Sequence, residues 1–242
     1  PKVDMRTGVV TGAEALVRGL DSAGRVIVPA RFIEAMERTG AIRELDLHVL
    51  NMTLAAMESW RRRGLRQVPV SVNFSRATLF SPSAPGSVLA LFSRYPLLAP
   101  SLLEIEISEN AGNVESHTME RAMAGFRPFG VRFGLDDFGT RYANLSLFTS
   151  VPFDTVKLDK SLIRDLAHNS VGRALVGDIV RLCKARNMAC VAEGVENQTQ
   201  INALLKEGCV LGQGFYYGRP MSVEDFERRC LATDAERQGD AS

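Results

Sequence analysis

The sequence has few of the residues that build disulfide frameworks, zinc sites or membrane spans. Its four cysteines form no Cys-x-x-Cys pair and no zinc-like spacing, which is typical of reduced thiols in the cytosol. No apolar run is long enough to cross a bilayer, and no signal-like segment opens the chain. We therefore expect a soluble, cytoplasmic domain. Because residue 1 is proline rather than methionine, we also expect upstream sensory or regulatory domains, which leaves a membrane-attached full-length protein open.

The chain also lacks an excess of charge of either sign. Its 242 residues carry a formal net charge of +1, with 24% charged and 45% hydrophobic residues. A nearly neutral chain has no overall positive charge that would attract a DNA or RNA polymer. A phosphate-bearing ligand is therefore expected to bind at a local site. The one dense basic run, Arg61-Arg62-Arg63, follows a helical pattern and indicates a helix C-terminus. The composition predicts one globular domain over residues 1–231, followed by a polar, disordered tail over residues 232–242.

Strand-like and helix-like segments alternate along the chain. Repetition at roughly 30 residues over a chain of about 250 is what a (β/α)₈ barrel requires. A doubly wound open sheet is the alternative, but no expected strand is followed by a Gly-x-Gly-x-x-Gly turn for a dinucleotide. Strands are expected at residues 9–17, 68–74, 102–107, 131–135, 155–158, 188–192 and 209–212. The main helices are expected at residues 30–39, 43–62, 114–126, 170–186, 198–206 and 223–230.

Two adjacent carboxylates, Asp136 and Asp137, end the apolar run 131–135, and the segment breaks at Gly139. Two like charges side by side repel one another unless cations lie between them. For an isolated Asp-Asp pair, a solvated turn capped by Asp137 is the better interpretation. The other expected strands favour a cation site over a solvated turn. Nearly all of them carry an oxygen ligand or a charge near the C-terminal end, where a barrel collects its catalytic residues. The residues at these ends are Glu14, Asn73, Glu106, Asp136, Asp137, Lys157, Asp159, Glu193 and Gln213.

The convergent set offers oxygen ligands without cysteine or histidine, which favours hard cations such as Mg²⁺ or Mn²⁺ over zinc or copper. The three histidines, His48, His117 and His168, lie on or beside helical stretches and are expected to be surface or core residues. Two ions bridged by Asp136 can clamp a water and a phosphodiester for in-line displacement. Lys157 can orient that water or offset charge on the phosphorus oxygens. The residue types alone thus predict metal-assisted phosphodiester hydrolysis.

Seven motifs, in order, resemble those of EAL domains, the bacterial phosphodiesterases that hydrolyse cyclic di-GMP to linear pGpG. The resemblance covers almost the whole chain, and seven ordered motifs are far more specific than a single tripeptide. It implies an α/β fold, a modified (β/α)₈ TIM-type barrel whose first strand is antiparallel to the others, with two Mg²⁺ or Mn²⁺ ions at the strand ends. The motifs are Gly12-Ala13-Glu14-Ala15-Leu16-Val17-Arg18, Ser71-Val72-Asn73-Phe74-Ser75, Glu104-Ile105-Glu106-Ile107-Ser108-Glu109, Asp136-Asp137-Phe138-Gly139-Thr140, Lys157-Leu158-Asp159, Ala192-Glu193-Gly194-Val195-Glu196 and Gln213-Gly214-Phe215.

The resemblance also implies residue roles in the attack of a metal-bound water on cyclic di-GMP. The catalytic positions are Lys157, which positions or deprotonates the water, Glu193, and Glu109, which steadies the loop after Asp137. A homodimer through the helices beside that loop is in keeping with the family. One ion is expected to bind Glu14, Asn73, Glu106 and Asp136, and the second Asp136, Asp137 and Glu193. Substrate contacts are expected at Arg18, Asp159, Glu196 and Gln213.

The loop after Asp137 departs from the family pattern. Where the family reads Gly-Thr/Ser-Gly-Tyr-Ser-Ser, this chain reads Gly139-Thr140-Arg141-Tyr142-Ala143-Asn144. At a position of positive φ, arginine costs about 1 kcal/mol more strain than glycine, and its cation can weaken metal binding or add a substrate contact. We favour an active phosphodiesterase, because every expected metal ligand is present. A catalytically weak cyclic di-GMP receptor is the alternative, and an unrelated barrel hydrolase with the same acidic face is a third.

Overall fold

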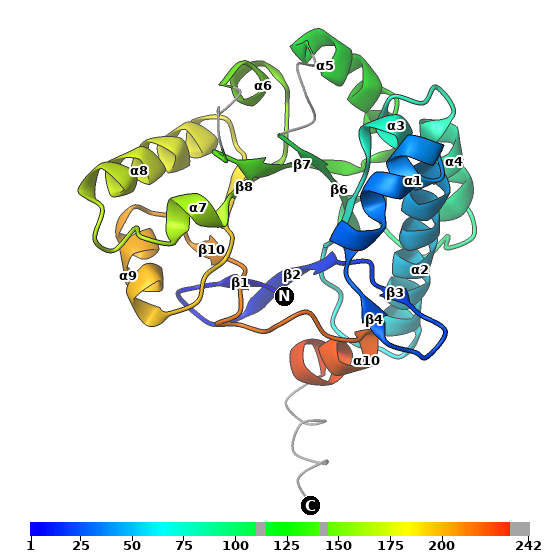
Figure 1. The fold of residues 1–242 in the computed structure, drawn as a ribbon, viewed down its shortest axis with the longest axis horizontal. Helices are drawn as coiled ribbons and strands as arrows, with labels where there is room; N and C mark the ends of the chain where they lie inside the picture. The colour runs from blue at the N-terminus through cyan, green and yellow to red at the C-terminus, as the bar shows by residue number, and fades with distance from the viewer. Residues whose placement is uncertain (110–114, 141–144, 233–242) are drawn as a thin grey trace, which may run out of the picture.

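The computed structural model describes residues 1–109, 115–140 and 145–232. Eight strands of this part of the chain close into a barrel, and helices lie around it (Figure 1). In order around the ring they are β1 (Lys2–Asp4), β10 (Leu211–Gly212), β9 (Ala189–Ala192), β8 (Thr155–Leu158), β7 (Arg132–Phe138), β6 (Leu103–Ser108), β5 (Val70–Asn73) and β2 (Val10–Ala15). Strand β1 pairs antiparallel with both β2 and β10, and the other neighbours in the ring pair parallel. The predicted barrel with an antiparallel first strand is confirmed, and the open sheet is excluded.

Helices follow most of the strands and pack on the outside of the ring. The α-helices are α1 (Ile33–Thr39), α2 (Ile42–Arg62), α3 (Arg76–Leu79), α4 (Ala84–Phe92), α5 (Ser116–Ala124), α6 (Leu145–Ser150), α7 (Lys160–Ile163), α8 (Ser170–Ala185), α9 (Gln198–Lys206) and α10 (Val223–Phe226). Shorter elements are the 3₁₀ turns η1 (Pro29–Arg31), η2 (Pro100–Leu102) and η3 (Arg127–Phe129), the π-helical turn η4 (Glu227–Leu231) and the hairpin of β3 (Gly19–Leu20) and β4 (Val26–Ile27). None of the helices described has both the length and the apolar character that spanning a membrane requires.

Each of the seven expected strands is present. The strand expected at residues 9–17 is β2, and the antiparallel strand β1 precedes it without having been expected. The sequence pattern does not predict β1, because three residues carry too little alternation to stand out from a loop. The short helices α3, α6 and α7 are likewise not predicted, because one or two turns give little helical periodicity. Helix α4 is not predicted either, because Pro85 and Gly86 in its first turn are typical of a loop. The basic run at 61–63 lies at the end of α2, as expected.

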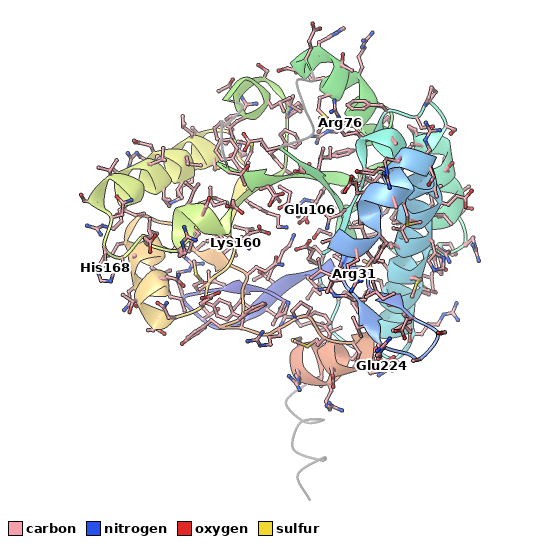
Figure 2. The ribbon with its side chains drawn as sticks, in the orientation of Figure 1. Arg31, Arg76, Glu106, Lys160, His168 and Glu224 are labelled. Atoms are coloured by element: carbon pink, nitrogen blue, oxygen red, sulfur yellow. The ribbon has the colours of Figure 1, made fainter. Side chains whose placement is uncertain are left out.

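The alternation of side chains along β6 separates an apolar layer from a charged one. Leu103, Ile105 and Ile107 belong to the hydrophobic core under the helices. Glu104 and Glu106 fall between them and therefore point to the opposite face, the interior of the barrel. Figure 2 labels Glu106 within the ring of strands. The apolar core thus holds the helices on the barrel, while Glu104 and Glu106 bring charged groups into its interior.

Candidate metal and active site

Lys157 lies at the centre of four carboxylates at the C-terminal ends of the barrel strands. Its side chain, on β8, is fully buried. Its ammonium Nζ is 2.7 Å from Glu193 Oε1 and 2.9 Å from Asp136 Oδ1. The same nitrogen is 2.9 Å from Glu106 Oε2 and 3.1 Å from Glu14 Oε2. One buried cation therefore faces four carboxyl groups, and these come from strands far apart in the sequence.

Two overlapping triads of carboxylates share Asp136. One oxygen from each of Glu14, Glu106 and Asp136 lies within 4.8 Å of the other two, and the same holds for Asp136, Asp137 and Glu193. Carboxylate oxygens are the donors that Mg²⁺ and Mn²⁺ prefer in proteins. The donor set and its spacing therefore fit two hard divalent ions that share the Asp136 carboxylate.

The electrostatics of Asp136 also fit a cation. Burial and the carboxylates of Glu193, Glu106 and Glu14 raise its pKa to about 8, although Lys157 acts in the opposite direction. Its Oδ1 atom is buried and receives no well-aligned hydrogen bond from any described residue, even though the Lys157 ammonium is 2.9 Å away. A divalent ion would supply the missing partner and keep the carboxylate ionised.

Lys157 and Glu106 form the charged pair at the base of this cluster. Burial opposes the charged form of Lys157, but the surrounding carboxylates, led by Glu106, raise its pKa well above the ordinary value. Burial likewise opposes ionisation of Glu106, but Lys157 and Lys2 lower its pKa to about 2. Both groups are charged at neutral pH. In this state Lys157 is a hydrogen-bond donor rather than a base. Of its two predicted roles, this favours positioning the attacking water over deprotonating it.

An irregularity at the end of β7, where its register with β8 shifts between Leu135 and Phe138, presents Asp137 beside Asp136. Asp137 has φ of 58°, in the left-handed region, which costs a residue with a side chain about 1–2 kcal/mol. Ser108 Oγ donates to Asp137 Oδ2 at 3.3 Å. Glu109 donates its backbone N–H to the Asp136 carbonyl and accepts the backbone N–H of Gly139 on Oε2, both at 2.8 Å. Glu109 thus ties the end of β6 to the end of β7 and to Gly139 after it, in line with the steadying role that the resemblance implies.

Two more of the predicted residues converge on Glu14. Asn73, at the end of β5, donates its Nδ2 amide to Glu14 Oε1 at 2.8 Å. Gln213, directly after β10, donates Nε2 to Glu14 Oε2 at 2.7 Å. The Gln213 Oε1 atom is buried and has no hydrogen-bond partner in the described part of the chain. Glu14 is therefore oriented from both sides.

The remaining predicted residues do not join this cluster. Arg18 follows β2 and is exposed, and Glu196 is exposed beyond the Glu193 segment. Asp159 caps the start of α7, where its carboxylate accepts a backbone N–H at 2.8 Å. Arg141, with residues 142–144, lies outside the described residues. The structure thus brings the predicted metal ligands and Lys157 together in one cluster. Of the predicted substrate contacts, only Gln213 lies in that cluster.

A cavity of about 530 Å³ opens beside the acidic cluster. It is lined mainly by apolar side chains from the ends of β2 and β5 and from α1 and α2, among them Leu16, Ile33 and Phe74. Asn73 belongs to both the cavity and the cluster, while Arg76 and Asp46 add polar groups to the cavity wall. A volume of this size takes a small organic ligand.

Two charged residues of the barrel interior, Lys2 and Glu104, were missed at the sequence level. The Lys2 ammonium is 2.8 Å from Glu106 Oε1 and 3.1 Å from Glu104 Oε1. A signal for Glu104 was available, because it precedes Glu106 by two residues and a strand places both on one face. Lys2 gave no comparable signal, since β1 itself is not predicted.

A closed (β/α)₈ barrel with charged residues gathered at the C-terminal ends of its strands is the arrangement of a barrel enzyme. The model of the EAL domain family matches residues 1–220. The chain therefore belongs to the EAL domain family, and the resemblance drawn from the motifs is confirmed.

Relatives and solved structures agree with this assignment. The bifunctional diguanylate cyclase/cyclic di-GMP phosphodiesterase MucR of Pseudomonas aeruginosa is 33% identical over 224 residues, which are 93% of this chain and 33% of MucR. Cyclic di-GMP phosphodiesterase PA2567 of the same species is 30% identical, over 94% of this chain and 38% of its own length. The chain thus spans about a third of the length of these curated relatives. A structure of the PaMucR phosphodiesterase in complex with c-di-GMP superposes with a TM-score of 0.85 at 33% identity, covering 93% of this chain and 91% of that one.

Proposed function

We propose that this domain hydrolyses cyclic di-GMP to linear pGpG and requires Mg²⁺ or Mn²⁺. The observation that carries the proposal is the pair of complete carboxylate triads that share Asp136 around Lys157. Each expected carboxylate ligand is present and reaches the cluster. The names of MucR and PA2567 state cyclic di-GMP phosphodiesterase activity for those proteins, which supports the choice of substrate.

The first ion would be held by Glu14, Glu106, Asp136 and the side-chain oxygen of Asn73, and the second by Asp136, Asp137 and Glu193. When bound, such ions polarise a phosphodiester and ease the ionisation of a coordinated water. The chain contributes the dry, rigid setting, because Lys157 and Glu106 are fully buried. Gln213 fixes the orientation of Glu14 through its amide.

Lys157 and Arg18 would act on the reacting phosphate from different positions. Lys157 presents N–H donors at the centre of the cluster, where they can orient the attacking water or stabilise charge on the phosphorus oxygens. Arg18, exposed after β2, can bind a phosphate oxygen with its fork of donors. The cavity beside Asn73 is large enough for a nucleobase of the substrate. Asp159 and Glu196 remain predicted supporting contacts.

Other expectations from the sequence and from the resemblance stay predictions. They are the homodimer, the attached upstream domains, the cytoplasmic location, and the effect of Arg141 on activity. A cyclic di-GMP receptor without turnover is the second candidate function, and the same experiment separates it from the enzyme.

The test is product formation by the purified domain with cyclic di-GMP and Mn²⁺, followed by chromatography. We expect pGpG to form, to disappear with chelator, and to fall at least about 100-fold in Glu193→Gln, since loss of a residue that only hydrogen-bonds to a metal ligand already costs up to that much. Glu224→Gln, which changes an exposed glutamate on α10, is the matched control and should leave the rate unchanged. Tight binding of cyclic di-GMP without turnover in Mn²⁺, and in a repeat with Mg²⁺, would reject the enzyme and support the receptor.

A further inference from the structure

Three of the four cysteines come together in the hydrophobic core. Cys183 lies in the last turn of α8, Cys190 on β9, and Cys209 just before β10. Cys183 and Cys209 are core residues, and Cys190 packs against that core. None of the three forms a disulfide. The fold thus gathers three thiols that show no Cys-x-x-Cys pattern in the sequence.

The thiols of Cys183 and Cys190 are hydrogen-bonded to each other. A hydrogen bond from the Cys190 thiol lowers the pKa of Cys183, against the effect of burial. The same bond, a contact with the Cys209 thiol and burial raise the pKa of Cys190 well above its ordinary value. Cys209 directs its own S–H to the backbone carbonyls of Cys190 and Leu211, at 3.6 Å from each. Cys183 and Cys190 are therefore the pair whose sulfurs share a proton, while the Cys209 thiol is bound to the backbone.

Exposure assigns different roles to the two paired sulfurs. Cys183 is fully buried, whereas Cys190 is partly exposed. The thiolate is the reactive form of cysteine, and a redox-sensing cysteine typically lies within reach of solvent and beside a second thiol. Because the pair shares one proton, its negative charge can pass from Cys183 to Cys190 across the hydrogen bond. A small oxidant from solvent therefore reaches Cys190 first, and Cys183 is the resolving thiol.

Strand β9 connects this thiol pair to the acidic cluster. Cys190 lies on β9, which ends at Ala192, and Glu193 follows directly. The Glu193 N–H donates to the Leu158 carbonyl at 3.0 Å, and its Oε1 atom is 2.7 Å from Lys157 Nζ. A covalent bond between the two sulfurs would draw the start of β9 towards α8, because bonded sulfurs lie closer together than hydrogen-bonded ones. The position of Glu193 therefore depends on the state of the thiol pair.

We propose that Cys183 and Cys190 form a redox-sensitive dithiol, which hydrogen peroxide converts to a disulfide that weakens divalent-ion binding through β9. The effect on the ion rests on the metal-dependent function proposed above. First, the Cys190 sulfur attacks a peroxide oxygen: an S–O bond forms, the O–O bond breaks, and the leaving hydroxide takes the thiol proton to become water. Then the Cys183 sulfur attacks the sulfenic sulfur of Cys190, an S–S bond forms, and the hydroxyl leaves with the second thiol proton as water. Two thiols are oxidised and one peroxide is reduced to two waters.

The first measurement maps the disulfide in the purified domain. Hydrogen peroxide is added, the remaining thiols are alkylated, and the tryptic peptides are identified by mass spectrometry. We expect a link between Cys183 and Cys190 in the parent that dithiothreitol reverses. Cys209→Ala is the matched control and should form the same link, whereas Cys183→Ala should form no link at Cys190. Trypsin places the three cysteines in different peptides by cleavage after Lys184, Arg186 and Lys206.

The second measurement compares the Mn²⁺ affinity of the reduced and the oxidised parent. Binding is followed by electron paramagnetic resonance after the peroxide is removed, with no substrate present. We expect oxidation to weaken Mn²⁺ binding about tenfold, the lower end of what loss of a residue that only hydrogen-bonds to a metal ligand costs, and dithiothreitol to restore it. Cys183→Ala keeps every expected metal ligand and every other oxidisable side chain, so it controls for oxidation elsewhere. Its affinity should not change with peroxide.

The outcomes separate this proposal from the proposed function. A link between Cys190 and Cys209, or peroxide treatment that leaves Cys183 and Cys190 unlinked, would overturn the proposal. So would a fully linked parent that binds Mn²⁺ as tightly as the reduced one. A reduced parent that binds Mn²⁺ and loses affinity on oxidation, but does not turn over cyclic di-GMP, would support the proposal and reject the proposed function alone.

Discussion

Substituting Asp136 by asparagine should stabilise the metal-free domain while removing its divalent-ion site. The surroundings of Asp136 oppose its ionisation: burial and the carboxylates of Glu193, Glu106 and Glu14 raise its pKa from 3.8 to about 8, against the influence of Lys157. The neutral amide of asparagine has nearly the same shape and avoids that cost. A functional carboxylate is thus expected to reduce the stability of the apo-protein.

The magnitude follows from the pKa. One pKa unit corresponds to about 1.4 kcal/mol, so ionising Asp136 at pH 7.5 costs the folded chain up to about 5 kcal/mol relative to the unfolded chain. The attraction to Lys157 is already contained in that pKa. Because the asparagine amide must still find hydrogen-bond partners in the buried site, we expect Asp136→Asn to recover only part of that cost, a net gain of about 2 kcal/mol, or about 4–8 °C in Tm for a domain of this size.

The sign of the pH dependence is fixed by the direction of the shift. A raised pKa means that the folded chain binds the Asp136 proton more tightly than the unfolded chain, so the stability it contributes is lost as pH rises from about 4 through 8. The Tm difference between Asp136→Asn and the parent should therefore be near zero at pH 4 and largest near pH 8.

The assay is thermal unfolding in chelator at several pH values, repeated with saturating Mn²⁺. Added Mn²⁺ should raise the Tm of the parent and reverse the order of the two proteins, because only the parent gains binding free energy. A parent that is more stable than Asp136→Asn in chelator at pH 7.5, or a difference that does not change with pH, would refute this account of the site.

Three further predictions concern other parts of the cluster. Glu14→Ala should lower pGpG formation at least about 100-fold with an unchanged circular dichroism spectrum, whereas the exposed Glu34→Ala should be silent; turnover retained in Glu14→Ala would contradict the ligand assignment. Asp137→Gly should raise the stability of the metal-free domain by about 1 kcal/mol, because glycine adopts φ of 58° without strain, and should weaken Mn²⁺ binding; a lower Tm in chelator would contradict it. Mn²⁺ binding at pH 7 should release about one proton per chain from Asp136, measured by calorimetry in two buffers, and binding without proton release would contradict its raised pKa.

The barrel and its acidic cluster could be predicted because each depends on a local pattern. The run 131–135 reads as a strand by itself, and the carboxylates of Asp136 and Asp137 follow it directly. Parallel strands then bring such ends to one face without further information. Glu106 and Glu193 were found for the same reason.

The contacts of Lys2 with Glu104 and Glu106 could not be predicted, because they depend on closure of the barrel. Lys2 meets Glu104 and Glu106 across more than 100 residues of sequence, and only the antiparallel pairing of β1 brings it there. Asp159 illustrates the opposite difficulty. It follows a strand as the other acidic residues do, but a backbone N–H two residues later takes its carboxylate for a helix cap.

The measurement that tests the central claim most directly is a titration of the parent with Mn²⁺ in which bound metal and pGpG formation are recorded together. The account predicts two ions per chain, pGpG formation that rises with occupancy of the second site, and the loss of both in Asp136→Asn. Full occupancy by Mn²⁺ with bound but uncleaved cyclic di-GMP would contradict it and assign the domain to the receptors.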